Sequence, residues 1–337
     1  MIYPKFIKKQ DTIGITAPSD GITASEKIVR LNSAINQLTE YGFQLYETKN
    51  VRQSEQGKSS TSQEQAKQLS ELLADKTVKA IICAAGGDFL LETLPYIDFD
   101  QIKQNPKWIQ GFSDPTGLLY TITTNLDIAT IYGDNIGSFG MIPWHESLYN
   151  NLKLLQGEQL IQNSFLKYQK EYQTYITGTE PYHLTENVYW KNLKNESNLE
   201  ITGRIIGGCL DVLNDLFGTR FDKTKEFIER YQTDGIIWYF DVCEFTSEQL
   251  IRTLWKWKDN DYFKHTQGII FGRIPKEHSY YDITLEQAIL HSLGDLNIPI
   301  IINTDIGHVS PRMTIINGSI ATITLKEGKG TITFELT

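Results

Sequence analysis

Residues 108–124 read WIQGFSDPTGLLYTITT, and this stretch sets the arrangement of everything around it. An apolar run ends at Gly111, a short Phe-Ser-Asp-Pro segment follows, and a second largely apolar run begins at once. The pattern predicts a strand that passes directly into a helix, because Pro115 suits the first helical turn, where its missing N–H is not needed. Ser113 then lies on a tight turn at the carboxyl edge of a sheet, where open α/β folds bind ligands.

The segments around this turn alternate between two patterns. Short β-branched or aromatic runs predict strands at 12–18, 43–48, 78–85, 107–112 and 128–133. Helical spacing predicts a helix at 24–41 that stops at Gly42, and another at 62–76 that opens with the capping-box pair Ser62 and Gln65. Strands that alternate with helices predict an α/β fold, here a Rossmann-like N-terminal domain whose parallel sheet is covered on both faces.

The second half regains this pattern after a polar interval. Residues ~145–200 are rich in Asn, Gln, Tyr and Glu and weakly periodic, which is typical of a connector. We therefore expect an N-terminal domain at 1–145 that carries Ser113, a connector at 146–200, and a C-terminal α/β domain with mixed strands at 201–337. The connector is either a surface excursion or a segment that also touches substrate.

Within the C-terminal domain the periodicity predicts individual elements. They are a helix at 207–219 entered through glycines, strands at 235–244, 268–274 and 298–307, helices at 246–258 and from Thr284, and a hairpin at 321–337. Thr246 and Gln249 form a capping box for the helix that begins there.

Charge and composition exclude several classes of function. The chain has 32 basic and 41 acidic residues, a formal net charge of −9, so nucleic acid and membranes are unfavourable partners. We see no signal peptide and no apolar run of the ~18 residues needed to span a bilayer. Cys83, Cys209 and Cys243 are far apart and lie in apolar contexts, a pattern that favours reduced thiols over disulfides or zinc. We expect a cytoplasmic protein with no cofactor and no metal.

Two turns of the N-terminal domain supply candidate catalytic groups: one contains a serine and the other contains paired glycines. A serine hydroxyl at 113 can act as a nucleophile, and backbone N–H groups at the start of the next helix can hold an oxyanion. The same Ser-Asp pair is also an ordinary helix N-cap. The paired glycines that end the strand at 78–85 let backbone approach a ligand, so the N–H of Gly87 is a second candidate donor, or part of a plain turn.

Two further candidates follow strands of the C-terminal domain. His308 comes just after an apolar strand, whereas the other histidines lie in polar contexts; a lone histidine can also be structural. Asp241 ends an otherwise apolar strand. A carboxylate there must be paired, hydrogen-bonded or used in the chemistry, because burial of a lone charge is costly. Asp241 is also a candidate cap for the helix that begins near Thr246. Together with Ser113 these residues supply a nucleophile, a base and an orienting acid, because a serine needs an imidazole to remove its proton and a carboxylate to hold that imidazole.

At this point the chain resembles the LD-carboxypeptidases, a serine peptidase family that includes murein tetrapeptide carboxypeptidases and microcin C immunity peptidases. The resemblance is carried by QDTIGITAPSD (10–20), AIICAAGGDFLLETLPYIDFDQIKQNPKWIQGFSDPTGL (80–118), GGCLDVLNDLFGT (207–219), GIIWYFDVCE (235–244) and DIGHVSPRMTIINGS (305–319). It implies a two-domain serine hydrolase without a metal, commonly a homodimer.

The resemblance also implies roles for single residues. Ser113 would be the nucleophile, His308 the general base and Asp241 the orienting acid, so that the triad assembles across the cleft between the domains. The backbone amides of Gly87 and Asp114 would form the oxyanion hole. Relatives carry glutamate where this chain has Asp241, and Glu244 is the alternative acid.

Other departures from the family pattern bear on the substrate. Ala85 stands where relatives often have arginine, Asp88 where an aromatic residue is common, and Tyr132-Gly133-Asp134 where many have His-Gly-Pro. We expect these positions near the mouth of the pocket.

Three functions follow in order. The first is a cytoplasmic serine carboxypeptidase that cleaves an amide bond near the C-terminus of small peptides such as murein tetrapeptides. The second is a microcin immunity-type hydrolase of peptidyl or aminoacyl nucleotides. The third belongs to another class, a non-catalytic two-lobed ligand-binding protein. A nucleotide-binding Rossmann enzyme is disfavoured because no G-x-G-x-x-G follows the first strand.

Overall fold

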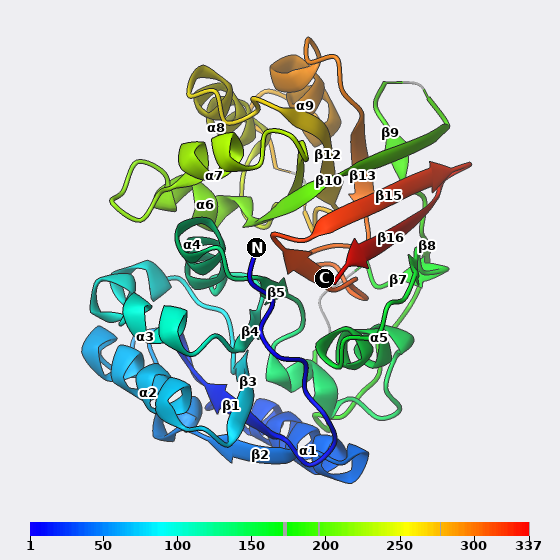
Figure 1. The fold of residues 1–337 in the computed structure, drawn as a ribbon. Coiled ribbons are helices and arrows are strands. Elements are labelled where there is room, and N and C mark those ends of the chain that lie inside the picture. Colours follow the sequence, from blue (N-terminus) through cyan, green and yellow to red (C-terminus); the bar gives the residue numbers. More distant parts are fainter. Residues whose placement is uncertain (171–173, 195, 277, 337) are drawn as a thin grey trace.

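The computed structural model describes residues 1–170, 174–194, 196–276 and 278–336. It contains two large sheets, each flanked by helices, and one lobe is built mainly from the first half of the chain and the other mainly from the second (Figure 1). The expected α/β fold with a parallel N-terminal sheet and a mixed C-terminal sheet is confirmed.

The first sheet has six strands among the described residues, in the order β14-β5-β4-β3-β1-β2. Their bounds are β1 (Thr12–Thr16), β2 (Gln44–Glu47), β3 (Val78–Cys83), β4 (Trp108–Gly111), β5 (Thr130–Tyr132) and β14 (Ile315–Asn317). All neighbours are parallel except β14, which pairs antiparallel to β5. The C-terminal half of the chain thus completes the sheet of the N-terminal lobe, which local sequence patterns do not indicate.

The helices of the first lobe follow the predicted alternation. They are α1 (Ser25–Tyr41), α2 (Ser62–Ala74), α3 (Phe99–Gln104) and α4 (Thr116–Leu126). Gly42 ends α1 in the left-handed region with φ 117°, as expected of a C-terminal glycine. Helix α2 begins at residue 62 as predicted, but its cap lies one residue earlier than the predicted pair of Ser62 and Gln65: Thr61 is the N-cap, and its hydroxyl accepts from the Glu64 N–H at 3.3 Å.

The second sheet has eight strands within the described ranges, in the order β6-β16-β15-β10-β11-β12-β13-β9. Their bounds are β6 (Gln162–Asn163), β9 (Lys191–Asn192), β10 (Asn198–Cys209), β11 (Ile236–Asp241), β12 (Thr266–Gly272), β13 (Ile300–Thr304), β15 (Ile320–Lys326) and β16 (Lys329–Glu335). Strands β10 to β13 are parallel, and β15 and β16 form the predicted terminal hairpin. Because β11 is buried along its whole length, it carries an unbroken apolar run rather than alternation.

The remaining elements are short. They are α5 (Glu146–Leu155), α6 (Leu210–Leu216), α7 (Thr224–Arg230), α8 (Ser247–Asp259), α9 (Leu285–Leu293), the strands β7 (Lys167–Tyr168) and β8 (Glu186–Asn187), and the 3₁₀ turns Lys49–Arg52, Leu90–Glu92, Leu94–Tyr96 and Ile136–Gly140. The predicted helix at 207–219 was too long, because Gly207 and Gly208 belong to β10. Capping boxes start α8 at Thr246 and α9 at Thr284.

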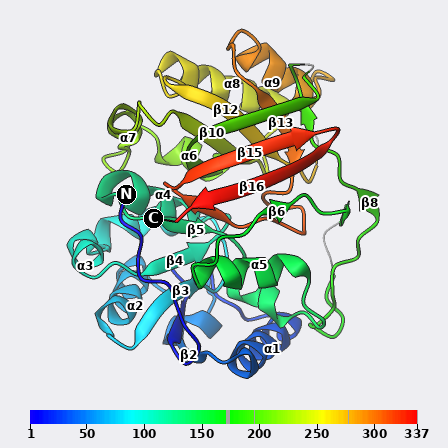
Figure 2. The ribbon, with the colours of Figure 1, turned by 45° about the vertical axis from the view of Figure 1, so that its right-hand side comes forward.

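Helix α4 lies between the two sheets in both views (Figures 1 and 2). Every residue from Thr116 to Thr124 is buried. The Thr116 hydroxyl accepts from the Cys209 N–H at 3.0 Å, and the Tyr120 hydroxyl lies 2.8 Å from that of Thr224. These contacts fix one lobe against the other, so that the carboxyl ends of their strands face a common space. The domain boundaries at 145 and 200 stay a prediction.

None of the helices within the described ranges is both long and apolar enough to cross a membrane.

Candidate active site

Ser113 lies on the sharp turn between β4 and α4. Its φ is 69°, a left-handed conformation that non-glycine residues adopt at a cost and that is often found at functional turns. The turn is held by the Thr116 N–H, which donates to the Ser113 carbonyl at 2.9 Å, and by the Phe112 N–H, which donates to Asn135 Oδ1 at 3.2 Å. The N-cap of α4 is Pro115, so Ser113 does not cap this helix.

Asp114 does not cap α4 either, and its carboxylate bonds to other segments instead. Its side chain is 2% exposed, and its Oδ2 accepts hydrogen bonds from the Ser19 hydroxyl and, at 2.9 Å, from the Leu90 N–H. Burial raises the pKa of this carboxyl, and those donors partly offset the effect. Asp114 therefore ties the serine turn to the segments that follow β1 and β3.

His308 brings the second lobe to the serine. It follows β13 in the loop that leads to β14, and its Nε2 lies 3.0 Å from Ser113 Oγ. Its Nδ1 lies 2.7 Å from Asp241 Oδ2, a close ion pair rather than a well-aligned hydrogen bond. The His308 backbone N–H also donates to Asp241 Oδ1 at 3.2 Å. The three predicted residues are thus adjacent in space, although Ser113 and His308 are far apart in sequence.

Asp241 ends β11 and is fully buried. Burial raises the pKa of its carboxyl, but the charge of His308 and the hydrogen bonds from His308 and Tyr132 together outweigh that effect, and the pKa is lowered. For His308, burial lowers the pKa, whereas the Asp241 carboxylate, with a smaller contribution from Cys243, raises it more, to about 10. Each charge therefore stabilises the other inside a desolvated site.

Tyr132 was not among the residues predicted for the site. Its hydroxyl donates to Asp241 Oδ2 at 2.5 Å and accepts from the Ser113 N–H at 3.3 Å. Burial raises the pKa of the phenol well above its usual range, so it remains a neutral donor. The position was expected at the pocket mouth, but the side chain lies beneath the serine and the acid. The feature that could have identified Tyr132 as a site residue is its position at the carboxyl end of β5, the strand next to β4.

Glu244, the alternative acid, lies elsewhere. Its side chain is exposed, and its backbone N–H donates to Asp211 Oδ1 at 3.0 Å. Asp241, rather than Glu244, occupies the position beside His308.

The glycine pair after β3 lies next to Ser113. A Cβ on Gly86 would lie 3.1 Å from Ser113 Oγ and 3.8 Å from the Asp114 nitrogen. Gly87 has φ 150°, and a Cβ there would come within 2.2 Å of Ser19 Oγ, so this position requires glycine, whereas a Cβ at Gly86 would crowd Ser113 without being excluded. Within the described ranges, the N–H groups of Gly87 and Asp114 donate to no other group. Their assignment to an oxyanion hole stays a prediction.

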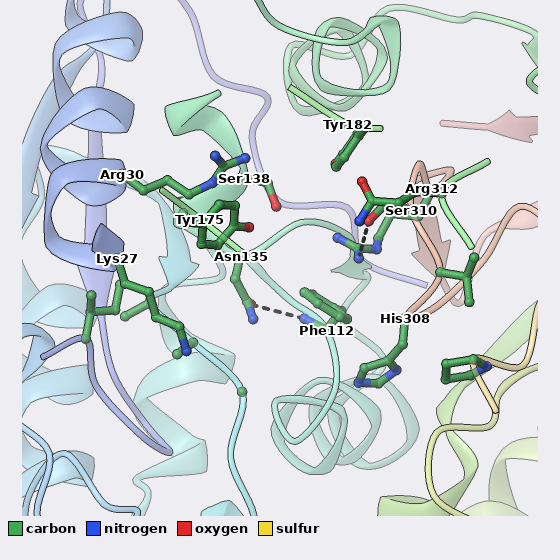
Figure 3. A pocket seen from close by; sticks show the side chains of 18 of the residues that line it. Lys27, Arg30, Phe112, Asn135, Ser138, Tyr175, Tyr182, His308, Ser310 and Arg312 are labelled. Atoms are coloured by element: carbon green, nitrogen blue, oxygen red, sulfur yellow. Dashed lines mark hydrogen bonds between the residues drawn. The ribbon is translucent and has the colours of Figure 1, made fainter. Parts of the chain in front are cut away.

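A pocket of about 410 Å³ opens beside His308 (Figure 3). Phe112, Asn135 and Ser138 line it from the first lobe, together with Ala85. The predicted connector contributes Tyr175 and Tyr182 to the lining, and its contact with a substrate stays a prediction. Residues 171–173 of this connector lie outside the described residues.

Two other departures from the family pattern differ in their relation to this pocket. Asp88 is exposed and is absent from the described lining. Asp134 is buried and forms an ion pair with Arg312, which lines the pocket from the second lobe. No group of three or more His, Cys, Asp or Glu side chains placed to hold a metal ion occurs in the described part of the chain.

Comparison with known proteins agrees with this architecture. The family model described as the LD-carboxypeptidase N-terminal domain matches residues 13–133, and the model of the C-terminal domain matches residues 202–323. The microcin C7 self-immunity protein MccF of Escherichia coli is 28% identical over 319 residues, which cover 90% of this chain and 88% of that protein. A Bacillus subtilis protein named as a murein peptide carboxypeptidase is 25% identical over 331 residues, which cover 96% of this chain and 92% of that protein.

Among solved structures, an MccF-like protein from Bacillus anthracis superposes with a TM-score of 0.84 at 27% identity, and the match covers 99% of both chains. The two family models together span more than two thirds of the sequence and one lies in each lobe. The chain therefore belongs to the LD-carboxypeptidase family and is a peptidase of that family.

Proposed function

We propose that this protein is a cytoplasmic serine carboxypeptidase that hydrolyses an amide bond near the C-terminus of small peptides such as murein tetrapeptides. The main support is one chain of contacts, from Ser113 Oγ to His308 Nε2 at 3.0 Å and from His308 Nδ1 to Asp241 Oδ2 at 2.7 Å. These are the separations that a proton transfer from serine to imidazole requires.

In the acylation step, Ser113 Oγ attacks the carbonyl carbon of the scissile amide and its proton passes to His308 Nε2. The negative charge on the carbonyl oxygen of the tetrahedral intermediate is held by the N–H groups of Gly87 and Asp114. The C–N bond then breaks, and His308 gives the proton to the leaving amine.

In the deacylation step, a water molecule takes the place of the amine. His308 removes a proton from this water as it attacks the acyl carbon, and then returns the proton to Ser113 Oγ. The ionised Asp241 keeps Nδ1 as the protonated nitrogen throughout, so that Nε2 faces the serine. Tyr132 and the His308 backbone N–H hold the carboxylate in place.

Hydrolysis of a peptidyl or aminoacyl nucleotide is the second candidate. It is favoured by the 28% identity to a protein named for microcin C7 self-immunity, over nine tenths of this chain. The same three side chains serve both reactions, because each is an acyl transfer to Ser113.

The decisive experiment measures turnover of a murein tetrapeptide and of a peptidyl adenylate analogue by the natural protein and by Ser113→Ala. We expect one substrate to be cleaved, and we expect the variant to remain folded and to lose at least about 10⁴-fold in kcat. Equal turnover by both proteins would reject the serine mechanism. Tight binding without turnover by the natural protein would favour the non-catalytic ligand-binding alternative.

We further propose that the enzyme works as a homodimer on a small substrate, with no cofactor, metal, nucleic acid or membrane. Light scattering of the purified protein measures its mass in solution.

A further inference from the structure

The pocket beside His308 has a charge opposite to that of the whole molecule. Its described lining includes four cationic side chains, Lys27, Arg30, Lys170 and Arg312, and no Asp or Glu. The chain as a whole has a net charge of −9. A concave surface lined by one sign of charge concentrates the field and attracts ligands of the other sign.

Arg312 does not contribute a net charge to this field. Its guanidinium is buried and forms an ion pair with Asp134, and its Nε donates to the Gly307 carbonyl at 2.7 Å. The remaining lining cations are Lys27, Arg30 and Lys170, and two of them, Lys27 and Arg30, lie together on α1.

Arg30 is the buried cation of these two. Its side chain is 3% exposed and pairs with no carboxylate within the described ranges. Its Nη1 donates at 3.1 Å to the carbonyl oxygens of Gly178 and Glu180, and its guanidinium packs 4.4 Å from the ring of Tyr175. Its buried Nε has no partner among the described residues. Burial of a cation without a carboxylate partner is costly, and an anion bound in the pocket would lower that cost further than the two carbonyl oxygens and the Tyr175 ring do.

Lys27 lies one helical turn before Arg30 on α1, so the two side chains share a helix face. It is exposed, lines the same pocket, and has no ion-pair partner in the described part of the chain. Figure 3 shows Lys27 and Arg30 on the side of the pocket opposite to His308, with Phe112 and Asn135 between them. A substrate that reaches from the serine across the pocket therefore meets two cations at its far end.

We propose that Lys27 and Arg30 form a subsite for an anionic group, a carboxylate or a phosphate, at the end of the substrate remote from the scissile bond. This inference rests on the proposed function, because it assumes that the reacting carbonyl lies at Ser113. Arg30 supplies a fixed positive charge, because its Nη1 is already held by two carbonyl oxygens, and Lys27 supplies a mobile point charge that follows the anion.

The test measures binding by calorimetry in the Ser113→Ala background, so that it does not depend on turnover. Two matched probe pairs identify the anion. The first is adenosine monophosphate against adenosine, and the second is a murein tetrapeptide with a free D-glutamate carboxylate against the same peptide with that carboxylate amidated. The ratio of the two dissociation constants within a pair reports the preference for the charge.

We expect Lys27→Gln to reduce this ratio about fivefold for at least one pair, and Arg30→Gln to reduce it about tenfold or more, because Arg30 is buried. Lys27→Arg should restore the preference. The control is Lys103→Gln, which removes an exposed lysine at the end of α3, outside the pocket.

The pair that responds identifies a phosphate or a carboxylate as the anion. Ratios near one in the Ser113→Ala protein, unchanged ratios in both pocket variants, or no binding of any probe at millimolar concentration would overturn the subsite. Arg30→Gln also loosens the loop at 175–180, but that effect weakens both members of a pair equally and leaves the ratio intact. Failure of the proposed function would appear separately, as absence of turnover by the natural protein.

Discussion

His308 is the residue whose protonation state decides whether the site can act. A general base must be neutral, whereas the Asp241 carboxylate favours the charged imidazolium and raises the pKa of His308, against the opposing effect of burial, to about 10. The active fraction therefore increases as the pH rises through this pKa.

We expect kcat/KM to rise with pH on a limb whose midpoint lies above 6.5, the ordinary pKa of histidine. Asp241→Asn removes the carboxylate, so the limb should move to lower pH while kcat falls by about 10³-fold or more. Measurement of kcat/KM from pH 5 to about 11 checks both effects, because the range then extends past the pKa of His308. The control Glu244→Gln removes an exposed carboxylate and should leave the profile in place. The opposite result, a limb that moves only in Glu244→Gln, would make Glu244 the orienting acid.

The loop between β13 and β14 is the element that carries His308 to the serine. Gly307 has φ 89°, and a Cβ at this position would lie 2.1 Å from Asp241 Oδ1. Only glycine lets the backbone approach the carboxylate so closely.

Gly307→Ala should therefore lower kcat by about 10²-fold, because the acid or the histidine must move by about 1 Å. Gly218→Ala is the matched control: Gly218 has φ 84°, but a Cβ there would meet nothing within 4 Å. Both variants should lose about 1–2 kcal/mol of unfolding free energy from backbone strain, which denaturant titration measures. A normal kcat in Gly307→Ala would contradict the account of this loop.

The same loop is anchored to the first lobe by the buried pair of Arg312 and Asp134. The Arg312 guanidinium also packs 4.0 Å from the ring of Phe112, the neighbour of Ser113, and its Nε donates to the Gly307 carbonyl at 2.7 Å. Arg312 therefore contacts the neighbours of both the serine and the histidine, and we assign it a positioning role.

Arg312→Met leaves Asp134 buried without its partner and should cost about 3–5 kcal/mol of unfolding free energy. Adding Asp134→Asn removes that unpaired charge, so the double variant should be more stable than Arg312→Met alone. In the double variant kcat should still be reduced, since the contact to the Gly307 carbonyl is absent. Denaturation and turnover of the natural protein, both single variants and the double variant check this, and strictly additive losses would argue against a coupled pair.

Local sequence patterns predicted some of the helices and strands and not others. The strands at β1, β3 and β4 and the hairpin of β15 and β16 followed from local periodicity, because burial on one or two faces leaves a direct pattern. The glycines before α6 were misassigned, since glycine occurs both at helix starts and in strands where backbone approaches closely. The return of β14 to the first sheet depends on long-range pairing that a local pattern does not encode.

At the level of the site, residue type and position at strand ends were sufficient to propose Ser113, Asp241 and His308. Tyr132 and Arg312 were not proposed, because a buried tyrosine in a strand and an arginine in a loop have many ordinary uses. Their contacts depend on how the two lobes meet.

The whole molecule is organised so that two sheets present their carboxyl edges to one another. Thr116 and Tyr120 of α4 bond to the second lobe, while Ser113 at the start of the same turn bonds to His308. The relative position of the lobes thus determines whether the serine hydroxyl is activated.

The measurement that tests this claim most directly is labelling with a fluorophosphonate, a reagent that reacts with activated serines, followed by mass spectrometry. We predict a single rapid adduct on Ser113 in the natural protein, and a rate at least about 10³-fold lower in His308→Ala, in which no imidazole removes the hydroxyl proton. Equal labelling of both proteins, or an adduct on another residue, would contradict the assembly of the nucleophile and its base across the two lobes.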